Sequence, residues 1–454
     1  MLQGWDPSWT VRRFDAAGAI DGSGRGASHP SGVSAVLERH PDGTLTLAAL
    51  GPTEQIASST RWAGVPVTDR RGRLLIPGLV NAHTHLDLTH IGPRPHDPGD
   101  GFSAWIDMII RERLSEEAPI VRAVRNGVGF LLAGGTVLVG DIAGVVAGKP
   151  STIPGRALAE DGRVNGVSFV EFFAQGAGGE GGLVGAVDAR DSLSATPDPL
   201  SRARIVFGLQ PHAPYSVGWG YYGRLIAGLD ADVPVCTHLA ESTAEREFIA
   251  RAAGPFRALL ERLGLWDPLT AESVGDGRTP IAHLADHLRA GRQSVVHCND
   301  VSDEDLDTLV GAQAPVIYCP RSSAYFGAER DFGPHRYRNM LSRGLTVALG
   351  TDSIVNLDTP DRISVWDEMR FLHRRDSFDP STLLKMATVN GAVALRRDPV
   401  LFTFSPLGTL AGLAAIRVPD ANPTLGGAEL LRRALAMPEG GEEGHPELLA
   451  IGRV

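Results

Sequence analysis

Residues 74–86 read Leu74-Leu75-Ile76-Pro77-Gly78-Leu79-Val80-Asn81-Ala82-His83-Thr84-His85-Leu86. The apolar run breaks at Pro77-Gly78, resumes, and ends in two histidines, as expected of a buried strand with both imidazoles at its carboxyl end. Alternate residues of a strand share a face, so the rings of His83 and His85 point the same way. Histidine is a common zinc ligand, and the pair suggests half of a metal site. Two ordinary core or surface histidines would fit this short pattern equally well.

The overall composition points to a globular protein that binds a small molecule. A chain of 454 residues exceeds the size at which a single core keeps growing, so a large domain and a smaller one are expected. Hydrophobic residues make up 43% and charged residues 21%, which is ordinary for a soluble protein. The net charge of −10 argues against nucleic acid or an anionic membrane as the main partner.

The cysteines and the first residues indicate a cytoplasmic protein. Three cysteines lie in apolar, strand-like runs without paired spacing, which favours reduced thiols over a disulfide framework: Cys236, Cys298 and Cys319. The first five residues lack a basic segment followed by an apolar one, so no signal peptide is expected. No apolar run approaches the roughly 18 residues that cross a bilayer.

Beyond residue 72, strand-like apolar segments alternate with amphipathic helical segments such as 245–263. Seven further strands are predicted, at 136–141, 167–172, 205–210, 233–238, 294–298, 315–319 and 345–352. Strands that alternate with helices pair in parallel through right-handed crossovers, and eight such units close into a (β/α)8 barrel with its active site at the carboxyl ends of the strands. An open doubly wound α/β sheet is the alternative, but the Gly-rich dinucleotide turn typical of it is missing from the sequence.

The two ends of the chain are expected to build the smaller domain together. Residues 1–72 consist of short strand-like pieces separated by Gly, Pro and Asp, and 407–410 and 448–451 resemble short strands that complete the same sheet. The prediction is a composite β-sandwich domain from 1–72 and 405–454, with the barrel at 73–404. The acidic, Gly-rich stretch 438–444 is expected to be a loop.

Ionisable side chains end several of the predicted strands. His238 ends the fifth strand, His297 the sixth and Asp352 the eighth. Three imidazoles and one carboxylate can hold a divalent ion and leave a position open for water, and the predicted ligands are His83, His85, His238 and Asp352. Considered alone, Asp352 could equally cap the following segment, and His297 could be an ordinary interior histidine.

Two more residues next to these strands are candidates for the chemistry. Glu241 follows His238 by one helical turn, which suits a general acid/base beside a metal-bound water, although a carboxylate at a helix start is the alternative. His212 lies between two prolines just after the fourth strand. It is a candidate for substrate contact, with a role in holding the turn as the alternative.

Taken together, several ordered motifs resemble the metal-dependent amidohydrolase superfamily, in its deaminase and chlorohydrolase branch. They are PGLVNAHTHL, PHAPYS, THLAES, VVHCN, YCPRSS, LGTDS and ATVNGA, in that order. The resemblance implies the barrel and composite β-sandwich described above and one metal ion on the four ligands already named. It also implies that Glu241 is the proton shuttle and that His297 polarises the attacked centre or orients the water.

The resemblance also bears on the metal count. Members with two metals generally use a carboxylated lysine as a bridge, and neither Lys149 nor Lys385 ends a predicted strand. One divalent ion is therefore expected, zinc first, with iron, manganese and nickel as alternatives.

The function implied is hydrolytic deamination of an amino-substituted purine nucleoside or related heterocycle. Residues 318–327 are more similar to the aminodeoxyfutalosine deaminase-like clade than to the adenosylhomocysteine deaminase clade. Arg321 and Tyr325 would then contact the sugar or tail, the alternatives being that Arg321 pairs with a carboxylate and Tyr325 packs. Trp105 would flank the pocket, with packing as its alternative.

Other functions stay open at this point. A chlorohydrolase and a deaminase of a free base such as guanine or cytosine are the enzymatic alternatives, and a degenerate barrel that binds a ligand without catalysis is the non-enzymatic one. A homodimer is expected because dimers are common among such proteins.

Overall fold

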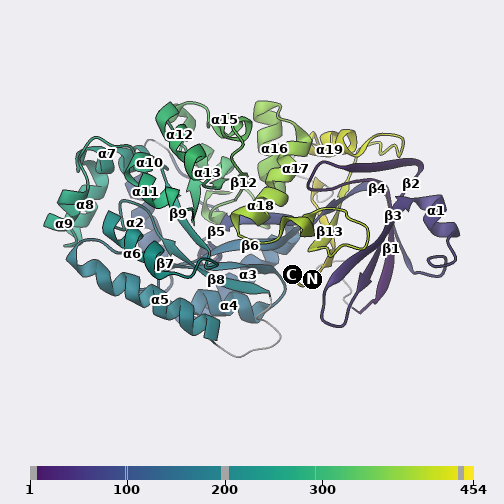
Figure 1. Ribbon diagram of the computed structural model, residues 1–454, viewed down its shortest axis with the longest axis horizontal. Helices are drawn as coiled ribbons and strands as arrows, with labels where there is room; N and C mark the ends of the chain where they lie inside the picture. Colours follow the sequence, from purple (N-terminus) through teal and green to yellow (C-terminus); the bar gives the residue numbers. More distant parts are fainter. Residues whose placement is uncertain (1–7, 98, 100, 196–203, 292, 438–443) are drawn as a thin grey trace.

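The structure is a computed structural model that describes residues 8–97, 99, 101–195, 204–291, 293–437 and 444–454. Two predictions fall on residues outside these ranges. One is the absence of a signal peptide, which rests on the first five residues, and the other is the loop at 438–444, of which only Gly444 is described. The molecule is elongated, with a barrel wrapped in helices at one end and a smaller sheet at the other (Figure 1).

Eight parallel strands form the barrel, in the spatial order in which they follow one another along the chain. They are β5 (Leu79–Thr84), β6 (Thr136–Ala143), β7 (Asn165–Phe172), β8 (Ile205–Pro211), β9 (Val235–Leu239), β10 (Gln293–His297), β11 (Val316–Tyr318) and β12 (Val347–Leu349). The last strand meets the first where the backbone N–H groups of Thr351 and Asp352 both donate to the carbonyl of His83, at 3.0 Å. These bonds bring the barrel close to closure and confirm the predicted (β/α)8 architecture.

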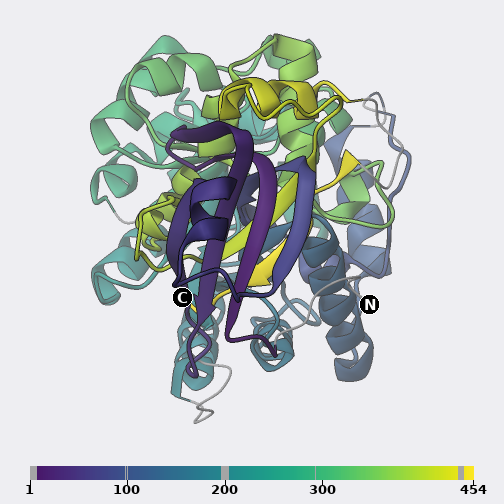
Figure 2. The same cartoon turned by 90° about the vertical axis from the view of Figure 1, so that its right-hand side faces the viewer.

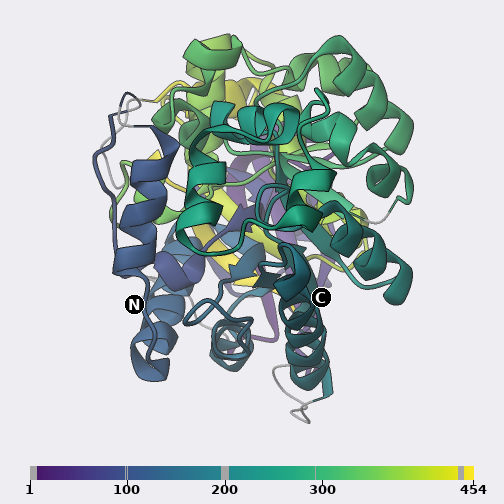
Figure 3. The same ribbon diagram turned by 90° about the vertical axis from the view of Figure 1, so that its left-hand side faces the viewer.

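Helices cover the outside of the barrel and the end far from the small sheet (Figure 3). The first half of the barrel carries α2 (Phe102–Glu112), α3 (Glu117–Ala133), α4 (Ile153–Asp161), α5 (Glu180–Ala195) and α6 (Trp219–Gly228). The fifth strand is followed by α7 (Thr243–Arg251), α8 (Gly254–Arg262), α9 (Pro268–Ser273), α10 (Pro280–His283) and α11 (Ala285–Arg289). The remainder are α12 (Asp303–Ala312), α13 (Pro320–Tyr325), α14 (Ala328–Phe332), α15 (Tyr337–Ser342), α16 (Val365–Asp376), α17 (Pro380–Met386) and α18 (Val389–Ala394).

The helix predicted over 245–263 is two helices. Between α7 and α8 the backbone turns left-handed at Ala252, with φ of 51°, and at Gly254, with φ of 83°. The hydrophobic spacing of 245–263 continues across this turn because both helices pack their apolar faces inward. The spacing therefore does not show that the segment is divided. Within the described residues, no helix combines the length and apolar character needed to cross a membrane.

The smaller sheet contains strands from both ends of the chain. It comprises β1 (Val11–Ile20), β2 (Gly26–Arg39), β3 (Leu45–Pro52), β4 (Val67–Pro77), β13 (Gly412–Arg417) and β14 (Glu447–Ile451), in the order β14-β13-β4-β1-β2-β3. Only β1 and β4 pair in parallel among these neighbours, so the sheet is mixed. Figure 2 shows the purple N-terminal strands beside the yellow C-terminal ones. α1 (Thr53–Ser58) and α19 (Gly427–Leu435) pack against this sheet.

The segment predicted as a strand at 407–410 lies along the edge of β3. The N–H of Leu410 donates to the carbonyl of Leu45 at 2.9 Å, and the N–H of Leu47 donates to the carbonyl of Gly408 at 3.0 Å. The segment therefore covers an edge that would otherwise expose unpaired backbone groups.

The run 74–86 belongs to two sheets. Its first part completes β4 of the small sheet and its second part is β5 of the barrel, with Gly78 between them. A Cβ at Gly78 would lie 2.3 Å from Cγ1 of Val137, so only glycine lets the chain pass this close to the neighbouring strand. We therefore propose Gly78, instead of 72/73, as the boundary between the two domains, and we retain 404/405 as the second boundary.

Candidate active site

The five strand-end residues named from the sequence lie together at the carboxyl ends of the barrel strands. His83 belongs to β5 and His85 follows it directly, His238 belongs to β9 and His297 ends β10, and Asp352 follows β12. All five are buried. Because β5 begins where β4 leaves the small sheet, these residues lie at the end of the barrel far from that sheet.

The histidine nitrogens and the Asp352 carboxylate converge. His83 Nε2 lies 3.3 Å from His238 Nε2, and Asp352 Oδ1 lies 4.0 Å from His83 Nε2 and 3.6 Å from His85 Nε2. His83, His85 and Asp352 form one set whose ligand atoms all lie within 4.8 Å of one another, and His83, His238 and His297 form another. The overlap of these sets identifies one cluster that can hold a metal ion.

The protonation of the imidazoles suits a cation. The Nδ1–H of His238 donates to the carbonyl of His212 at 2.9 Å, which leaves the lone pair of its Nε2 facing the cluster. Burial, with help from the neighbouring imidazoles, lowers the pKa of His83 and His85 well below the usual range and that of His238 to about 3. Neutral imidazoles are the metal-binding form, and three of them with one carboxylate fit a divalent ion such as zinc.

Asp352 is held by polar groups that sequence reasoning did not single out. Its Oδ2 accepts hydrogen bonds from Ser322 Oγ at 2.6 Å and from Asn356 Nδ2 at 2.9 Å, and its Oδ1 accepts from the N–H of Ser353 at 2.7 Å. These donors fix the carboxylate with Oδ1 towards the histidines. They are characteristic of the second layer of a metal site, which orients the ligands.

Glu241 and His297 face one another beside this cluster. His297 Nε2 lies 3.4 Å from Glu241 Oε1. Burial raises the pKa of Glu241 well above its usual range, and the nearby carboxylates of Asp352 and Glu245 raise it further, while burial lowers the pKa of His297 to about 3. A protonated carboxyl beside a neutral imidazole is an arrangement that can give a proton to a substrate.

Glu245 holds the turn that presents Glu241. Its buried carboxylate accepts hydrogen bonds from the N–H of Ala240 at 2.9 Å and of Glu241 at 2.8 Å. Ala240 is left-handed, with φ of 56°, a conformation that needs such support. In the sequence, Ser242 and Glu245 have the spacing of a helix capping box, which accounts for Glu245 without suggesting this role.

We expect Glu245→Gln to lower the turnover rate about 10-fold while leaving the metal content unchanged. An amide offers only one acceptor oxygen, so one of the two N–H groups faces an NH₂ and the turn loosens, at the cost of about one buried hydrogen bond. Steady-state kinetics and metal analysis of the variant test this, with the exposed Glu304→Gln of α12 as a matched control. A variant with the wild-type rate would show that the turn does not depend on Glu245.

His212 lies next to a charged group that the sequence analysis missed. His212 Nδ1 bonds Ser216 Oγ at 2.7 Å, and its Nε2 lies 3.9 Å from Glu171 Oε1. Arg113 bridges Glu171 and Asp87, with a 3.4 Å contact to each. Glu171 was overlooked although its strand was predicted, because no neighbouring motif draws attention to it.

Trp105 and Tyr325 belong to a group of ring side chains that also includes His96 and Phe326. The Trp105 ring lies 5.3 Å from that of Phe326, and Tyr325 stacks on His96 at 4.9 Å. The Nε1 of Trp105 and the Oη of Tyr325 are buried, and within the described ranges neither has a hydrogen-bond partner. Among the described residues, both atoms thus lack the partner that buried polar groups usually have.

Arg321 makes the carboxylate pairing that was the alternative to substrate contact. Its Nε donates to Glu368 Oε1 at 2.6 Å, one terminal nitrogen to Asp358 Oδ1 at 3.0 Å, and the other to the carbonyl of Ser364 at 3.5 Å. Each guanidinium nitrogen thus has a partner in the protein. We therefore do not include Arg321 among the residues proposed to bind the substrate.

Comparison with known proteins gives consistent relatives. The chain is 27% identical over 390 residues to a protein named aminodeoxyfutalosine deaminase from Deinococcus radiodurans, covering 81% of each chain. It is 26% identical over 371 residues to a 5-methylthioadenosine/S-adenosylhomocysteine deaminase from Syntrophomonas wolfei, covering 79% of this chain and 76% of the relative.

Among solved structures, the fold is similar to that of atrazine chlorohydrolase from Arthrobacter aurescens in complex with zinc. The TM-score is 0.68 at 17% identity, and the match covers 97% of this chain and 96% of the other. The sequence profile described as "Amidohydrolase family" matches residues 74–401, which include the whole cluster. The chain therefore belongs to the amidohydrolase family.

Proposed function

We propose that this protein is a metal-dependent hydrolase that releases ammonia from an amino-substituted purine nucleoside or a related heterocycle. The observation that carries the proposal is the position of the Glu241 carboxyl, whose pKa burial raises, 3.4 Å from His297 and beside the cluster of histidines and Asp352. Removing an amino group from a ring requires an acid for the ring nitrogen and a base for the attacking water.

The residues of the cluster, together with Glu241 and His297, each have a part in this chemistry. A divalent ion held by His83, His85, His238 and Asp352 would lower the pKa of a bound water towards about 7. Asp352 accepts a proton from the attacking water, and Glu241 gives its proton to the ring nitrogen next to the amino-bearing carbon. His297 donates a hydrogen bond to the oxygen that has added to this carbon. Asp352 then passes the proton that it accepted to the amino group, the C–N bond breaks as ammonia leaves, and the proton of the added hydroxyl returns to Glu241.

A single zinc ion is our proposal for the metal. Lys149 lies in the loop after β6 and Lys385 lies in α17, and neither is among the residues of the cluster. The arrangement of three nitrogens and one oxygen suits zinc and also iron, manganese or nickel. Metal analysis of protein purified without a chelator distinguishes these ions and counts them.

For the substrate, we propose an adenine nucleoside of the aminodeoxyfutalosine type. The similarity to the relative from Deinococcus radiodurans supports this choice. Nε1 of Trp105 and Oη of Tyr325, which have no partner among the described residues, would bind its polar groups, and His212 would contact it from the segment that follows β8. The similarity in fold to a chlorohydrolase keeps chloride release from a triazine as the second candidate.

We expect the zinc-loaded enzyme to release ammonia from an adenine nucleoside with kcat/KM of about 10⁴ M⁻¹ s⁻¹ or more, the lower end of the usual range for a true substrate. A panel of adenine nucleosides, guanine, cytosine and chlorotriazines, assayed for both ammonia and chloride, tests this. A higher rate on a free base or a chlorotriazine would identify one of the alternatives instead. Fully loaded protein without activity on the panel would favour a ligand-binding barrel.

A further inference from the structure

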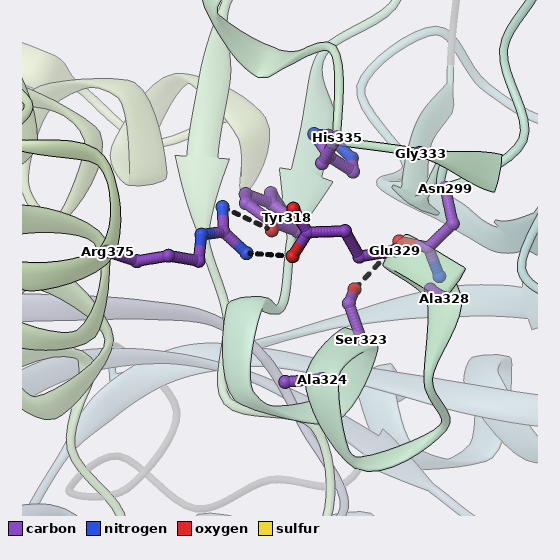
Figure 4. Close-up of a pocket in the computed structure, with 9 residues that line it drawn as sticks. All are labelled: Asn299, Tyr318, Ser323, Ala324, Ala328, Glu329, Gly333, His335 and Arg375. Atoms are coloured by element: carbon purple, nitrogen blue, oxygen red, sulfur yellow. Dashed lines mark hydrogen bonds and ion pairs between the residues drawn. The ribbon is translucent and has the colours of Figure 1, made fainter. Parts of the chain in front are cut away.

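His335, a partly buried histidine, lies on the wall of a small cavity (Figure 4). We refer to His297 and Glu241, which act in the proposed reaction, as the catalytic pair. His335 Nε2 donates to the backbone carbonyl of His297 at 2.9 Å. The cavity is also lined by Asn299, Tyr318 and Ser323, which come from segments following or ending neighbouring barrel strands. His335 itself lies between α14 and α15, 38 residues beyond the carbonyl that it binds.

The His335 ring is fixed in one tautomer and one orientation. The N–H of Tyr337 donates to its Nδ1 at 3.0 Å, so the ring proton must lie on Nε2, where it can reach the His297 carbonyl. The ring stacks on Tyr318, with centroids 3.7 Å apart and planes inclined by 13°. Because Tyr318 ends β11, this stacking ties the imidazole to the barrel.

His297 depends on such support because its backbone is unusual. It is left-handed, with φ of 75°, and so is Cys298, with φ of 51°. Left-handed residues other than glycine are held by their surroundings against a cost of about 1–3 kcal/mol. The side chain has few hydrogen bonds to restrain it, since Nδ1 has no partner among the described residues and the printed contact of Nε2 is with Glu241 Oε1, at 3.4 Å. Its ring also stacks on that of His238, with centroids 5.4 Å apart. The direction of the imidazole therefore depends on the backbone as well as on this neighbouring ring.

The same wall holds the other member of the pair. Asn299 Nδ2 donates to the backbone carbonyl of Glu241 at 3.1 Å, and Asn299 Oδ1 accepts from Ser323 Oγ at 2.7 Å. Both backbone carbonyls of the catalytic pair are thus bound by side chains that line one cavity.

We propose that His335 is a positioning residue for the reaction: its Nε2–H holds the His297 carbonyl, keeps the left-handed backbone in place, and so aims the His297 imidazole at Glu241 and the substrate. Its effect on the rate depends on the deaminase function proposed above, whereas its effect on the geometry of His297 does not.

Two variants of His335 separate the hydrogen bond from the packing. His335→Phe keeps a ring that can stack on Tyr318 and removes the donor, and His335→Gln restores an N–H close to the position of Nε2. We expect the Phe variant to lose about 10-fold in kcat, with KM changed by less than about 2-fold and metal content unchanged, as for one lost hydrogen bond in the transition state. The Gln variant should recover most of this loss.

Crystal structures of the two variants give a readout that needs no substrate. The contact between His297 Nε2 and Glu241 Oε1 should lengthen in the Phe variant and persist in the Gln variant. The matched control is His373 of α16. Its Nδ1 donates to the carbonyl of Phe378, just after this helix, at 3.0 Å. His373→Phe should change neither kcat nor the position of His297.

Either of two results would overturn the proposal. One is a Phe variant with unchanged kcat or an unmoved His297, and the other is a Gln variant as impaired as the Phe variant. If no substrate is found for the wild-type enzyme, the proposed function fails, and the crystal structures still decide whether His335 positions His297.

Discussion

Glu241→Gln is expected to lower kcat by about 100-fold or more while the protein keeps its metal, because a lost acid/base group usually costs 10²–10⁴ in rate. The amide has nearly the same shape as the acid, but it cannot give up a proton to the ring nitrogen. Burial and the nearby carboxylates raise the pKa of Glu241 well above its usual range, which favours the protonated form that this step requires. Kinetics on the best substrate of the panel, together with metal analysis, measure both quantities.

A matched control is Glu272→Gln, an exposed residue of α9, which should leave kcat unchanged. Near-normal turnover in the Glu241 variant would remove this residue from the role of proton shuttle. A parallel loss of metal and activity would instead show that Glu241 acts by supporting the cluster.

Asp352→Asn should abolish tight metal binding and lower activity by about 1,000-fold or more. Asp352 supplies a carboxylate oxygen 3.6 Å from His85 Nε2 and 4.0 Å from His83 Nε2, and Ser322 and Asn356 both donate to its other oxygen. An asparagine placed there offers no negative charge and turns an NH₂ towards either the donors or the metal. Losing the ion removes an electrostatic contribution of several kcal/mol, which corresponds to a rate factor of this size.

Dialysis against a chelator followed by zinc titration tests this second prediction. The wild-type apoprotein should regain its activity as zinc is added, and the Asp352 variant should not. Asp303→Asn, at an exposed position at the start of α12, should behave like the wild type. An Asp352 variant that binds zinc normally and remains active would mean that the ion is held without this carboxylate.

Much of the architecture could be predicted from local patterns. All eight barrel strands lie where the apolar segments placed them, because parallel barrel strands are buried on both faces and read as continuous apolar runs. The cluster followed from the same patterns, since polar residues that end parallel strands meet at one edge of the barrel. His83, His85, His238, His297 and Asp352 are together for this reason.

Sequence patterns were less informative where contact with a residue far away in the chain decides the local structure. The run 74–86 is divided at Gly78 because Val137 leaves no room for a side chain there, and the hydrophobic spacing of 245–263 does not show the left-handed turn at Ala252. Arg321 stands in a motif beside the site, yet its guanidinium pairs with Glu368 of α16.

The sequence alone therefore predicted the barrel and the family, which the structure and the comparisons confirm, and it named the histidines and the aspartate of the cluster that can hold a metal ion. The roles of Glu241 and His297 in proton transfer stay predictions. The barrel and the cluster follow from the periodicity and order of residues along the chain, which report which side chains are buried and at which strand end they lie. Only the tertiary structure revealed the groups that bind them: Glu245 at the turn of Glu241, Ser322 and Asn356 on Asp352, and His335 on the His297 carbonyl. These supports are hydrogen bonds that depend on ångström-scale distances, several between segments far apart in the chain, and such distances exist only once the barrel has closed.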